Sequence, residues 1–248
     1  MNKFKGKIAL VTGGTSKIGE KICVDLKNQG CKVYFTYNQN KQKAESLIED
    51  YNLSAIQANF LLESNIREVF KVIYDESGKL DFLVNNASYS SEKLWNIKPT
   101  KISLDQWEKC LKIDLTAVFL CSKFSIPLME KDGGAIVNFS SSGSMRGDAD
   151  TFIYNSAKVG VVGLTKSLAR ALAPNIRANV IAPGSIKTDW IEGWKLSDSE
   201  KKNLQAVKKM MKRLGKPKEV SDLVQFLLSN NSSYITGQLI YIDGGISA

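Results

Sequence analysis

The sequence predicts an α/β fold: a mostly parallel, doubly wound sheet of seven strands with helices on both faces. Short apolar runs alternate with segments of helical periodicity from one end of the chain to the other, as successive βαβ units require. The chain has 248 residues, which is enough for one α/β domain with a substantial core and short for two. We therefore expect a single domain over residues 1–248.

The strands are predicted by seven apolar runs, which span Lys7–Thr12, Lys32–Tyr37, Ala55–Asn59, Phe82–Asn85, Ala135–Phe139, Arg177–Ile181 and Leu239–Ile242. The helices are predicted between them, at about Ile18–Gln29, Gln42–Glu49, Asn65–Glu76, Leu104–Met129, Phe152–Leu172 and Glu219–Leu228. The only long irregular stretch runs from Pro183 to about Lys208. A loop of that length inside a compact domain indicates a lid or binding segment, which we place at about 185–210.

The composition excludes several kinds of chemistry. The chain has no histidine, so Ser-His-Asp and Cys-His catalysis and every His-ligated metal site are excluded. A general acid must then be Tyr, Lys, Cys or a carboxylate. The four cysteines are scattered without a metal-ligand spacing, so we expect no metal site and reduced thiols in a cytoplasmic protein.

The net charge of +9 favours phosphorylated or acidic partners through long-range attraction. The lysines are spread through the predicted helices and not gathered in one block with aromatics, so a solvated surface is favoured over nucleic-acid binding. No apolar run is long enough to span a bilayer, and the polar N-terminus gives no secretory signal. We expect neither nucleic acid nor membrane as a partner.

A tyrosine and a lysine four residues apart, Tyr154 and Lys158, follow the serine run Ser140-Ser141-Ser142. At this spacing the two side chains share one face of a helix. A nearby ammonium favours the phenolate and is expected to lower the pKa of the tyrosine, so that the pair can move protons near neutral pH. Alone, this spacing also suits a half-buried Tyr with a solvated Lys.

Three polar motifs follow predicted strands. The first, after the first strand, is the turn from Thr12 to Gly19, where glycines allow the backbone to approach a pyrophosphate at a helix N-terminus. The second is Asn85-Asn86-Ala87-Ser88, and the third runs from Ala182-Pro183-Gly184 to Thr188. All three fall at the carboxyl ends of parallel strands, where ligands bind in this fold.

With these motifs, the chain resembles the classical short-chain dehydrogenases/reductases over nearly its full length. The last part, with Tyr234-Ile235-Thr236-Gly237-Gln238, Ile242-Asp243-Gly244-Gly245 and Arg213 to Val220, is especially similar to the 3-oxoacyl-[acyl-carrier-protein] reductases of fatty acid biosynthesis. The resemblance implies a Rossmann-like fold and a nicotinamide-dependent oxidoreductase. It implies that Tyr154 protonates a carbonyl oxygen, that Lys158 lowers the tyrosine pKa and holds the ribose, and that Ser141 orients the carbonyl.

The resemblance also assigns the remaining site residues. The helix that carries the fourth catalytic residue matches the segment around Asp114. The cofactor-binding positions are Gly13, Thr15, Ser16, Lys17, Ile18, Gly19, Tyr37, Asn38, Asn59, Phe60, Asn86, Ala87, Tyr154, Lys158, Pro183, Gly184, Ile186 and Thr188. Thr188 resembles the residue that contacts the nicotinamide carboxamide, and capping of the next helix is its alternative role.

NADP(H) is predicted over NAD(H) by the end of the second strand. An acidic residue there would bond the adenosine ribose and disfavour a 2′-phosphate. The strand ends in Tyr37 and Asn38 with no acid, and the nearest cations are Lys41 and Lys17. Both lysines would also suit a solvated surface.

Four positions depart from the family pattern. Lys17 replaces the middle glycine of the turn, Asp114 stands where the family usually has Asn, Ser88 replaces a glycine, and Asn59 replaces an acid near the adenine. A carboxylate has no hydrogen-bond donor whereas an amide has two, so Asp114 is expected to change the proton balance around Lys158.

Three functions stay open. The first is reduction of a 3-oxoacyl thioester on an acyl carrier protein, which would suit the basic chain. The second is reduction or oxidation of a small alcohol, sugar or secondary metabolite. Trp190 and Trp194 of the lid would either line an apolar pocket for it or only pack the lid. The third is a cofactor-binding regulatory protein with weak catalysis. The family is commonly tetrameric, so we expect a homotetramer or homodimer.

Overall fold

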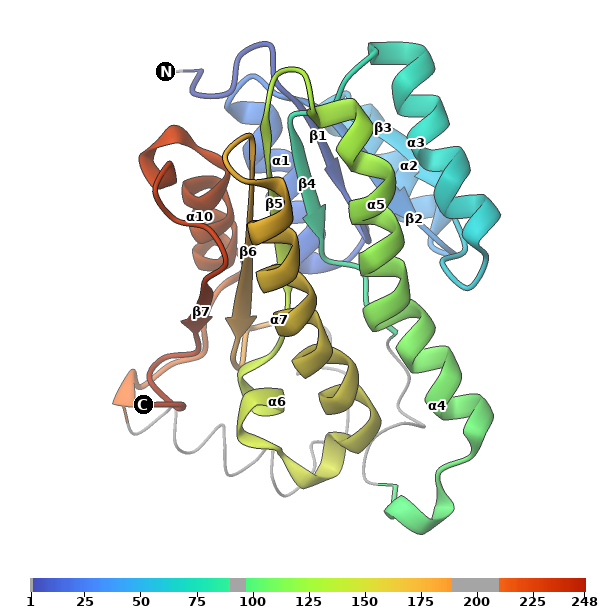
Figure 1. The fold of residues 1–248 in the computed structure, drawn as a ribbon, viewed down its shortest axis with the longest axis vertical. Helices are drawn as coiled ribbons and strands as arrows, with labels where there is room; N and C mark the ends of the chain where they lie inside the picture. Colours follow the sequence, from blue (N-terminus) through green and yellow to red (C-terminus); the bar gives the residue numbers. More distant parts are fainter. Residues whose placement is uncertain (1, 90–96, 189–209) are drawn as a thin grey trace.

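The computed structural model describes residues 2–89, 97–188 and 210–248 of the chain. Seven strands form one sheet in the order β3-β2-β1-β4-β5-β6-β7, and every neighbouring pair is parallel. The order reverses between β1 and β4, so the sheet is doubly wound, and the carboxyl ends of β1 and β4 diverge there. The predicted fold class is confirmed (Figure 1).

The strands cover β1 Ile8–Val11, β2 Lys32–Tyr37, β3 Ser54–Gln57, β4 Phe82–Asn85, β5 Gly134–Phe139, β6 Ile176–Pro183 and β7 Leu239–Ile242. These bounds lie within two residues of the predicted ones, because the apolar runs are buried on both faces of the sheet. In β1, for example, all four residues are buried.

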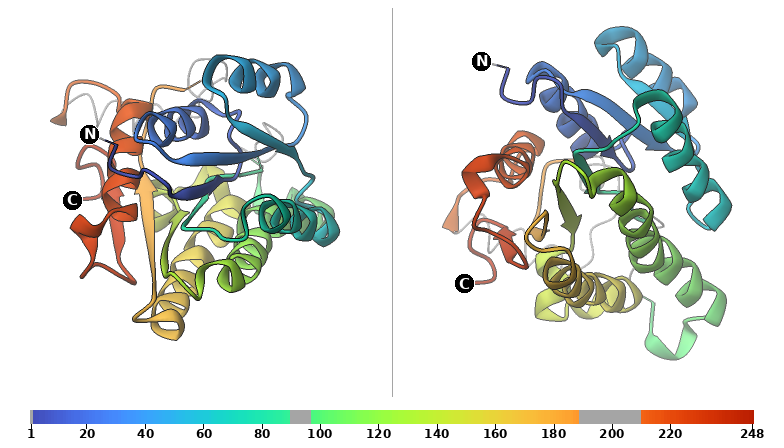
Figure 2. Two further views of the ribbon diagram at one scale, coloured as in Figure 1. Left: turned by 90° about the horizontal axis from the view of Figure 1, so that it is seen from above. Right: turned by 45° about the horizontal axis from the view of Figure 1, so that its top comes forward.

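The helices are α1 Lys17–Asn28, α2 Lys41–Tyr51, α3 Glu63–Ser77, α4 Leu104–Leu111, α5 Ala117–Met129, α6 Ser142–Arg146, α7 Phe152–Leu172 and α10 Pro217–Leu228. Short 3₁₀ turns cover η2 Pro99–Lys101, η4 Ala149–Thr151 and η5 Asn230–Ser232. Figure 2 shows helices on both sides of the sheet. No helix in the described ranges is both long and apolar enough to cross a membrane.

Two apolar cores lie on the opposite faces of the sheet. On one face Leu26 of α1 and Val224 of α10 pack with Val11 of β1. On the other face Ile66 of α3 and Cys121 of α5 pack with Leu10 of β1. Consecutive residues of one strand thus enter different cores, as the two-residue period of a strand requires. The sheet is held between these layers, and its carboxyl edge stays open for a site.

The predicted helix Leu104–Met129 is interrupted. A five-residue π-helical segment, η3 Lys112–Thr116, separates α4 from α5. Single π turns inside helices occur frequently at functional sites. The periodicity of apolar residues continues through the interruption, so the sequence pattern did not reveal it. The segment carries Asp114, whose side chain is fully buried.

Candidate active site

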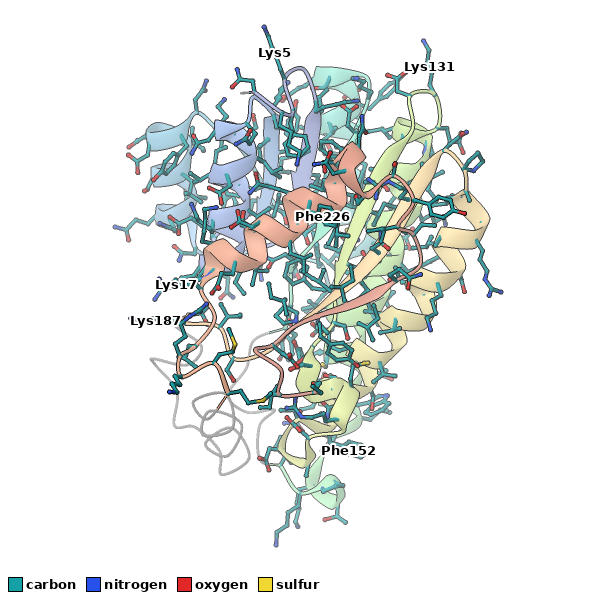
Figure 3. The ribbon with its side chains drawn as sticks, turned by 90° about the vertical axis from the view of Figure 1, so that its left-hand side faces the viewer. Lys5, Lys17, Lys131, Phe152, Lys187 and Phe226 are labelled. Atoms are coloured by element: carbon teal, nitrogen blue, oxygen red, sulfur yellow. The ribbon has the colours of Figure 1, made fainter. Side chains whose placement is uncertain are left out.

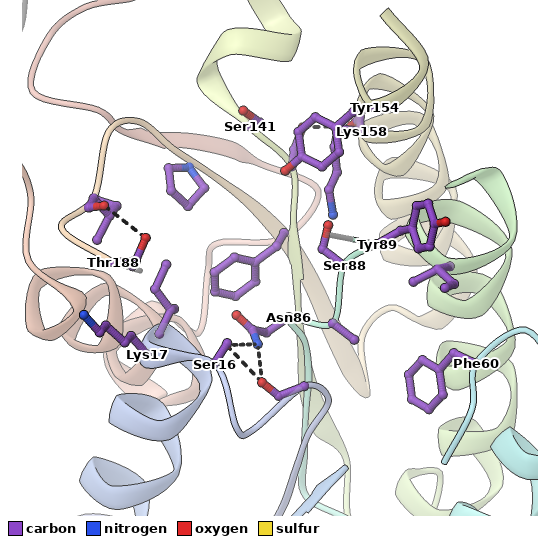
Figure 4. Close-up of a pocket in the computed structure, with 18 of the residues that line it drawn as sticks. Ser16, Lys17, Phe60, Asn86, Ser88, Tyr89, Ser141, Tyr154, Lys158 and Thr188 are labelled. Atoms are coloured by element: carbon purple, nitrogen blue, oxygen red, sulfur yellow. Dashed lines mark hydrogen bonds between the residues drawn. The ribbon is translucent and has the colours of Figure 1, made fainter. Parts of the chain in front are cut away.

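A cavity of about 920 Å³ opens at the carboxyl edge of the sheet. Its wall is formed by the segments that follow β1, β2, β4, β5 and β6, together with the first turns of α7. Figure 4 shows Ser16 and Asn86 on one side of this space and Ser141, Tyr154, Lys158 and Ser88 on another. The fold therefore brings polar groups from distant parts of the sequence to one edge, as expected for parallel strands.

The glycine turn after β1 is closely packed. Gly13 has a positive φ of 67°, which favours glycine, and a Cβ on Gly19 would lie 2.3 Å from the carbonyl oxygen of Gly13. Ser16 caps α1, because its Oγ accepts a hydrogen bond from the Gly19 backbone nitrogen at 3.1 Å. The N-terminus of α1 meets the cavity at Lys17 and Ile18. The positive end of the helix dipole and this backbone space fit a pyrophosphate.

Asn86 joins the end of β4 to the glycine turn. Its Nδ2 donates to the carbonyl oxygens of Thr12 and Gly13, at 3.0 Å each. In return, Oγ1 of Thr12 accepts hydrogen bonds from the backbone nitrogens of Asn86 and Ala87, also at 3.0 Å. These bonds hold the two loops in register, so the floor of the cavity is rigid before any ligand arrives.

Tyr154 and Lys158 lie one turn apart on α7, as the spacing predicts. The Nζ of Lys158 lies 5.4 Å from the centroid of the Tyr154 ring. Only 1% of Lys158 is exposed. Ser140 at the end of β5 donates its hydroxyl hydrogen to the Lys158 carbonyl oxygen at 2.8 Å, which anchors α7 to the sheet. Ser141, the next residue, lines the cavity at the start of α6.

Asp114 lies behind Lys158 as its buried counter-ion. The distance from Lys158 Nζ to Asp114 Oδ1 is 3.0 Å. The same oxygen accepts a hydrogen bond from the Ser88 hydroxyl at 2.5 Å, and Oδ2 accepts one from the Tyr89 backbone nitrogen at 3.0 Å. The thiol of Cys110 donates to Oδ2 at 3.6 Å. The carboxylate is thus surrounded by donors, which is what a buried charge requires.

These charges set the proton affinities of the pair. Burial raises the pKa of Tyr154, the Lys158 ammonium lowers it, and Asp114 raises it again, so the pKa lies above its ordinary value. Burial lowers the pKa of Lys158, but the Asp114 and Tyr154 charges raise it, and the result is also above the ordinary value. The expectation of a lowered tyrosine pKa is therefore wrong. Lys158 acts in the expected direction, but burial and Asp114 outweigh it.

Most of the sequence-predicted site residues line the cavity. They are Gly13, Thr15, Ser16, Lys17, Ile18, Tyr37, Asn38, Asn59, Phe60, Asn86, Ala87, Ser141, Tyr154, Lys158, Pro183, Gly184, Ile186 and Thr188. Two do not: Gly19 lies beneath the turn and Asp114 lies behind Lys158. Lys41 also points away, with its Nζ 3.6 Å from Glu45 on the exposed face of α2.

Other residues reach the cavity without having been predicted. Ser88 and Tyr89 follow Asn85-Asn86-Ala87, Arg146 is the last residue of α6, and Asp148 comes just after that helix. The Arg146 guanidinium pairs with the Asp148 carboxylate at 2.9 Å. Ser88 belonged to the predicted motif after β4 and was noted as a departure from the family, but it was not given a site role. For Arg146 and Asp148 no sequence signal exists, because α6 itself was not predicted.

The lid is only partly described. Its first residues, up to Thr188, line the cavity, and the Thr188 hydroxyl donates to the carbonyl oxygen of Ile186 at 3.3 Å. Trp190 and Trp194, expected either to line an apolar pocket or to pack the lid, lie outside the described residues, as does most of the segment 185–210. The described residues hold no group of three or more His, Cys, Asp or Glu side chains that could bind a metal ion.

A family profile described as "Enoyl-(Acyl carrier protein) reductase" matches residues 13–247. The chain belongs to the short-chain dehydrogenase/reductase family. Members of this family of oxidoreductases interconvert CH–OH and C=O groups with a nicotinamide cofactor, and the cavity fits such a group. The close-packed glycine turn and the N-terminus of α1 fit its pyrophosphate, and Tyr154 and Lys158 lie at the other end.

Two relatives with assigned names are 3-oxoacyl-[acyl-carrier-protein] reductases. The one from Aquifex aeolicus is 38% identical over 98% of each chain. The one from Staphylococcus aureus is 34% identical over 97% of this chain and 98% of its own. An uncharacterised oxidoreductase of Bacillus subtilis, YxbG, is 36% identical over all of this chain and 93% of its own. The chain is therefore a classical short-chain dehydrogenase/reductase close to the 3-oxoacyl reductases.

Solved structures agree with this placement. A doubly substituted short-chain dehydrogenase/reductase of Serratia marcescens superimposes with a TM-score of 0.90 and 29% sequence identity. The match covers 99% of this chain and 100% of that one. The short-chain dehydrogenase/reductase architecture thus extends over almost the whole chain.

Proposed function

We propose that the protein catalyses the NADP-dependent reduction of a carbonyl to a secondary alcohol, and that its substrate is a 3-oxoacyl thioester on an acyl carrier protein. The observation that carries this proposal is the single cavity that joins the glycine turn with Ser141 and Tyr154. The names of the relatives from Aquifex and Staphylococcus support the substrate class.

In the proposed reaction, the hydroxyls of Ser141 and Tyr154 bond the substrate carbonyl oxygen. Two donors aimed at one oxygen stabilise the negative charge that develops there. Tyr154 then gives its proton to that oxygen, and the buried Lys158 charge favours the phenolate that remains. The bound nicotinamide supplies the hydride. Asp114 holds Lys158 in place through their ion pair at 3.0 Å.

The preference for NADP(H) is supported by the charges around the cavity. The described residues that follow β2 into the cavity are Asn38, Gln39 and Asn40, which carry no carboxylate. Lys17 lines the cavity at the start of α1, and Lys187 lies at the same end of the molecule (Figure 3). A 2′-phosphate would meet cations and amides there.

The remaining partners follow from the same proposal. A basic chain with a net charge of +9 suits an acidic carrier protein as the donor of substrate. We place the protein in cytoplasmic fatty acid biosynthesis, and its four cysteines are free thiols. A homotetramer or homodimer is proposed, supported by exposed apolar residues on two helices, Phe119 of α5 and Val159 of α7. Sedimentation velocity would measure the oligomeric state.

The test begins with fluorescence titrations of NADPH and NADH, followed by turnover of acetoacetyl-coenzyme A and of a panel of small alcohols, aldehydes and sugars. Tighter binding of NADPH with turnover of the 3-oxoacyl thioester supports the proposal. Turnover only of a panel compound would replace the substrate class. Tight NADPH binding without turnover, by wild type and by Asp114→Asn, would favour a regulatory cofactor-binding protein.

The role of Tyr154 has its own test. Tyr154→Phe removes the proton donor and keeps the ring, so reduction is expected to fall by about 10² to 10⁴-fold while NADPH binding is kept. Tyr51→Phe, on the exposed end of α2, is the matched control and should leave turnover unchanged. Near-normal turnover by Tyr154→Phe would contradict the proposed mechanism.

A further inference from the structure

Arg146 brings a guanidinium to the wall of the cavity near Ser141. It is the last residue of α6, the short helix that begins directly after Ser141, and both residues line the cavity. Side chains of a helix lean toward its N-terminus. Here the side chain folds back along α6, since its Nη1 donates to the Ser142 hydroxyl at 3.3 Å. The guanidinium therefore lies beside the residue that follows Ser141.

Two further bonds fix the guanidinium in place. Its Nη1 also donates to the Ser247 hydroxyl at 3.1 Å, and its Nη2 donates to Asp148 Oδ2 at 2.9 Å. Both acceptors are themselves held. The Ser247 backbone nitrogen donates to the buried Asp243 carboxylate at 3.1 Å, and the Asp148 backbone nitrogen donates to the Gly143 carbonyl oxygen at 3.1 Å. The guanidinium is thus oriented before a ligand binds.

The guanidinium keeps donors for a ligand. Arginine carries five N–H donors and no acceptor. Within the described ranges, the three bonds of Arg146 all come from its two terminal nitrogens, so Nε–H and one N–H of Nη2 have no protein acceptor there. A quarter of the side chain is exposed, 25%. Because the residue lines the cavity, a ligand in the cavity can accept from these donors.

Asp148 decides which kind of acceptor suits this position. Its carboxylate lies 2.9 Å from the guanidinium, so the two charges largely cancel. A ligand carboxylate or phosphate would be attracted by Arg146 and repelled by Asp148. An uncharged oxygen avoids this repulsion and still receives a hydrogen bond from a charged donor, which is stronger than one from a neutral donor. The pair therefore favours a carbonyl or hydroxyl oxygen over an anion.

A 3-oxoacyl thioester offers such an oxygen. A single methylene separates its 3-oxo carbon from its thioester carbonyl carbon. With the 3-oxo oxygen bonded by Ser141 and Tyr154, the thioester carbonyl can reach the wall beside Ser141, where the guanidinium lies.

We propose that Arg146 donates a hydrogen bond to the thioester carbonyl oxygen of the substrate, and that this bond selects 3-oxo thioesters over ketones without a second oxygen. The proposal rests on the proposed function, which places the reacting carbonyl at Ser141 and Tyr154. It gives a substrate-binding role to a residue that no sequence motif assigned to the site.

Three probes that share a methyl ketone test this selection. S-Acetoacetyl-N-acetylcysteamine carries the thioester carbonyl, the thioether S-(3-oxobutyl)-N-acetylcysteamine has a methylene in its place, and acetoacetate has a carboxylate there. The KM and kcat are measured for the thioester. Inhibition constants are measured for the thioether and for acetoacetate against thioester reduction, so that neither compound needs to turn over.

Arg146→Met removes the donors and keeps an unbranched side chain. The KM of the thioester is expected to rise by about tenfold or more with kcat little changed, as for the loss of a bond from a charged donor. The inhibition constant of the thioether and the NADPH dissociation constant should stay unchanged, whereas a merely structural role would weaken both probes alike. Arg67→Met, which breaks an exposed pair with Glu63 at 2.9 Å on α3, is the matched control and should change none of these constants.

Asp148→Asn tests the charge argument with a side chain of the same size. Without the opposing carboxylate, Arg146 should attract anions, so the inhibition constant of acetoacetate is expected to fall by about fivefold. The inhibition constant of the uncharged thioether should stay unchanged. This variant keeps the proposal testable if urea unfolding shows that Arg146→Met does not fold.

The proposal is overturned if Arg146→Met keeps the wild-type KM for the thioester, or if it weakens the thioester and the thioether equally. An unchanged inhibition constant of acetoacetate in Asp148→Asn would overturn it as well. Failure of the proposed function looks different, because wild type would then not reduce the thioester at all. If wild type reduces the thioester and only the response to Arg146→Met is missing, the role of Arg146 alone is wrong.

Discussion

The Asp114 carboxylate and the Lys158 ammonium form a fully buried ion pair, 3.0 Å apart, directly behind the phenol of Tyr154. An amide at position 114 would leave the ammonium as a single positive charge at this point. Here a negative charge accompanies it, so the charge that Tyr154 meets is partly cancelled. Burial of the phenol is the main reason that Lys158 does not bring the pKa of Tyr154 below its ordinary value, and the Asp114 charge adds to it.

The first prediction concerns stability. Asp114→Asn removes one partner of the pair and leaves the Lys158 ammonium buried without its counter-ion. Breaking a buried pair in this way costs about 3 to 5 kcal/mol. We expect a correspondingly lower midpoint in urea unfolding, with an unchanged slope. The matched control is Asp105→Asn, which breaks an exposed pair with Lys109 at 2.8 Å and should leave the midpoint where it is. Equal midpoints for Asp114→Asn and wild type would mean that the pair contributes nothing to folding.

Much of the fold could be read from the sequence. The buried strands β2 and β4 appear as apolar runs and have the predicted bounds. The partly exposed edge strand β7 also has its predicted bounds, and the other strands deviate by one or two residues. The three motifs that follow strands predicted which edge of the sheet carries the cavity, and the family resemblance named most of its individual residues. Because parallel strands all end at the same edge of the sheet, residues that follow different strands lie close together there.

The rest depends on tertiary contacts that no local pattern encodes. The π-helical segment that carries Asp114 keeps helical periodicity, and the short helix α6 has too few residues to show any. Ser88 was recognised as a departure from the family, but its bond to Asp114 joins residues 26 positions apart. Burial and the Asp114 charge together raise the pKa of Tyr154 above its ordinary value. The spacing between Tyr154 and Lys158 in the sequence gives no information on either of them.

The second prediction concerns pH. In the proposed reaction the phenol of Tyr154 gives the proton. Because its pKa lies above its ordinary value, the phenol persists through neutral and mildly alkaline pH. The rate of reduction should stay level and decline only above the pH at which an ordinary tyrosine ionises. Oxidation of an alcohol needs the phenolate and should accelerate as pH rises over the same range. Asp114→Asn removes a charge that raises the pKa of Tyr154. In this variant the decline of the reduction rate and the rise of the oxidation rate should therefore both occur at lower pH. A reduction rate that already falls between neutral pH and pH 9 would contradict the assignment.

The third prediction concerns the glycine turn. A Cβ on Gly19 would lie 2.3 Å from the Gly13 carbonyl oxygen, so Gly19→Ala must displace the turn beneath the proposed pyrophosphate site. We expect the NADPH dissociation constant to rise by about tenfold or more, which corresponds to roughly 1.4 kcal/mol. Gly163→Ala is the control, because it lies exposed within α7 with nothing within 4 Å of its added Cβ. It should bind NADPH normally and gain about 0.5 to 1 kcal/mol in unfolding free energy. Normal NADPH affinity in Gly19→Ala would show that the turn does not hold the cofactor.

The fourth prediction concerns the choice between the two nicotinamide cofactors. Lys17 stands where the family usually has glycine, and it lines the cavity at the start of α1. If it meets the 2′-phosphate, Lys17→Glu should weaken NADPH by about tenfold more than NADH, since only NADPH carries that phosphate. Lys5→Glu makes the same change of charge at the top of the view in Figure 3, well above Lys17. Lys5→Glu controls for the effect of the overall positive charge of the protein. It should not alter the ratio of the dissociation constants of NADPH and NADH. The measurement is the pair of fluorescence titrations for each variant. Equal losses for NADPH and NADH in Lys17→Glu would mean that Lys17 acts on the shared pyrophosphate and that another group selects the cofactor.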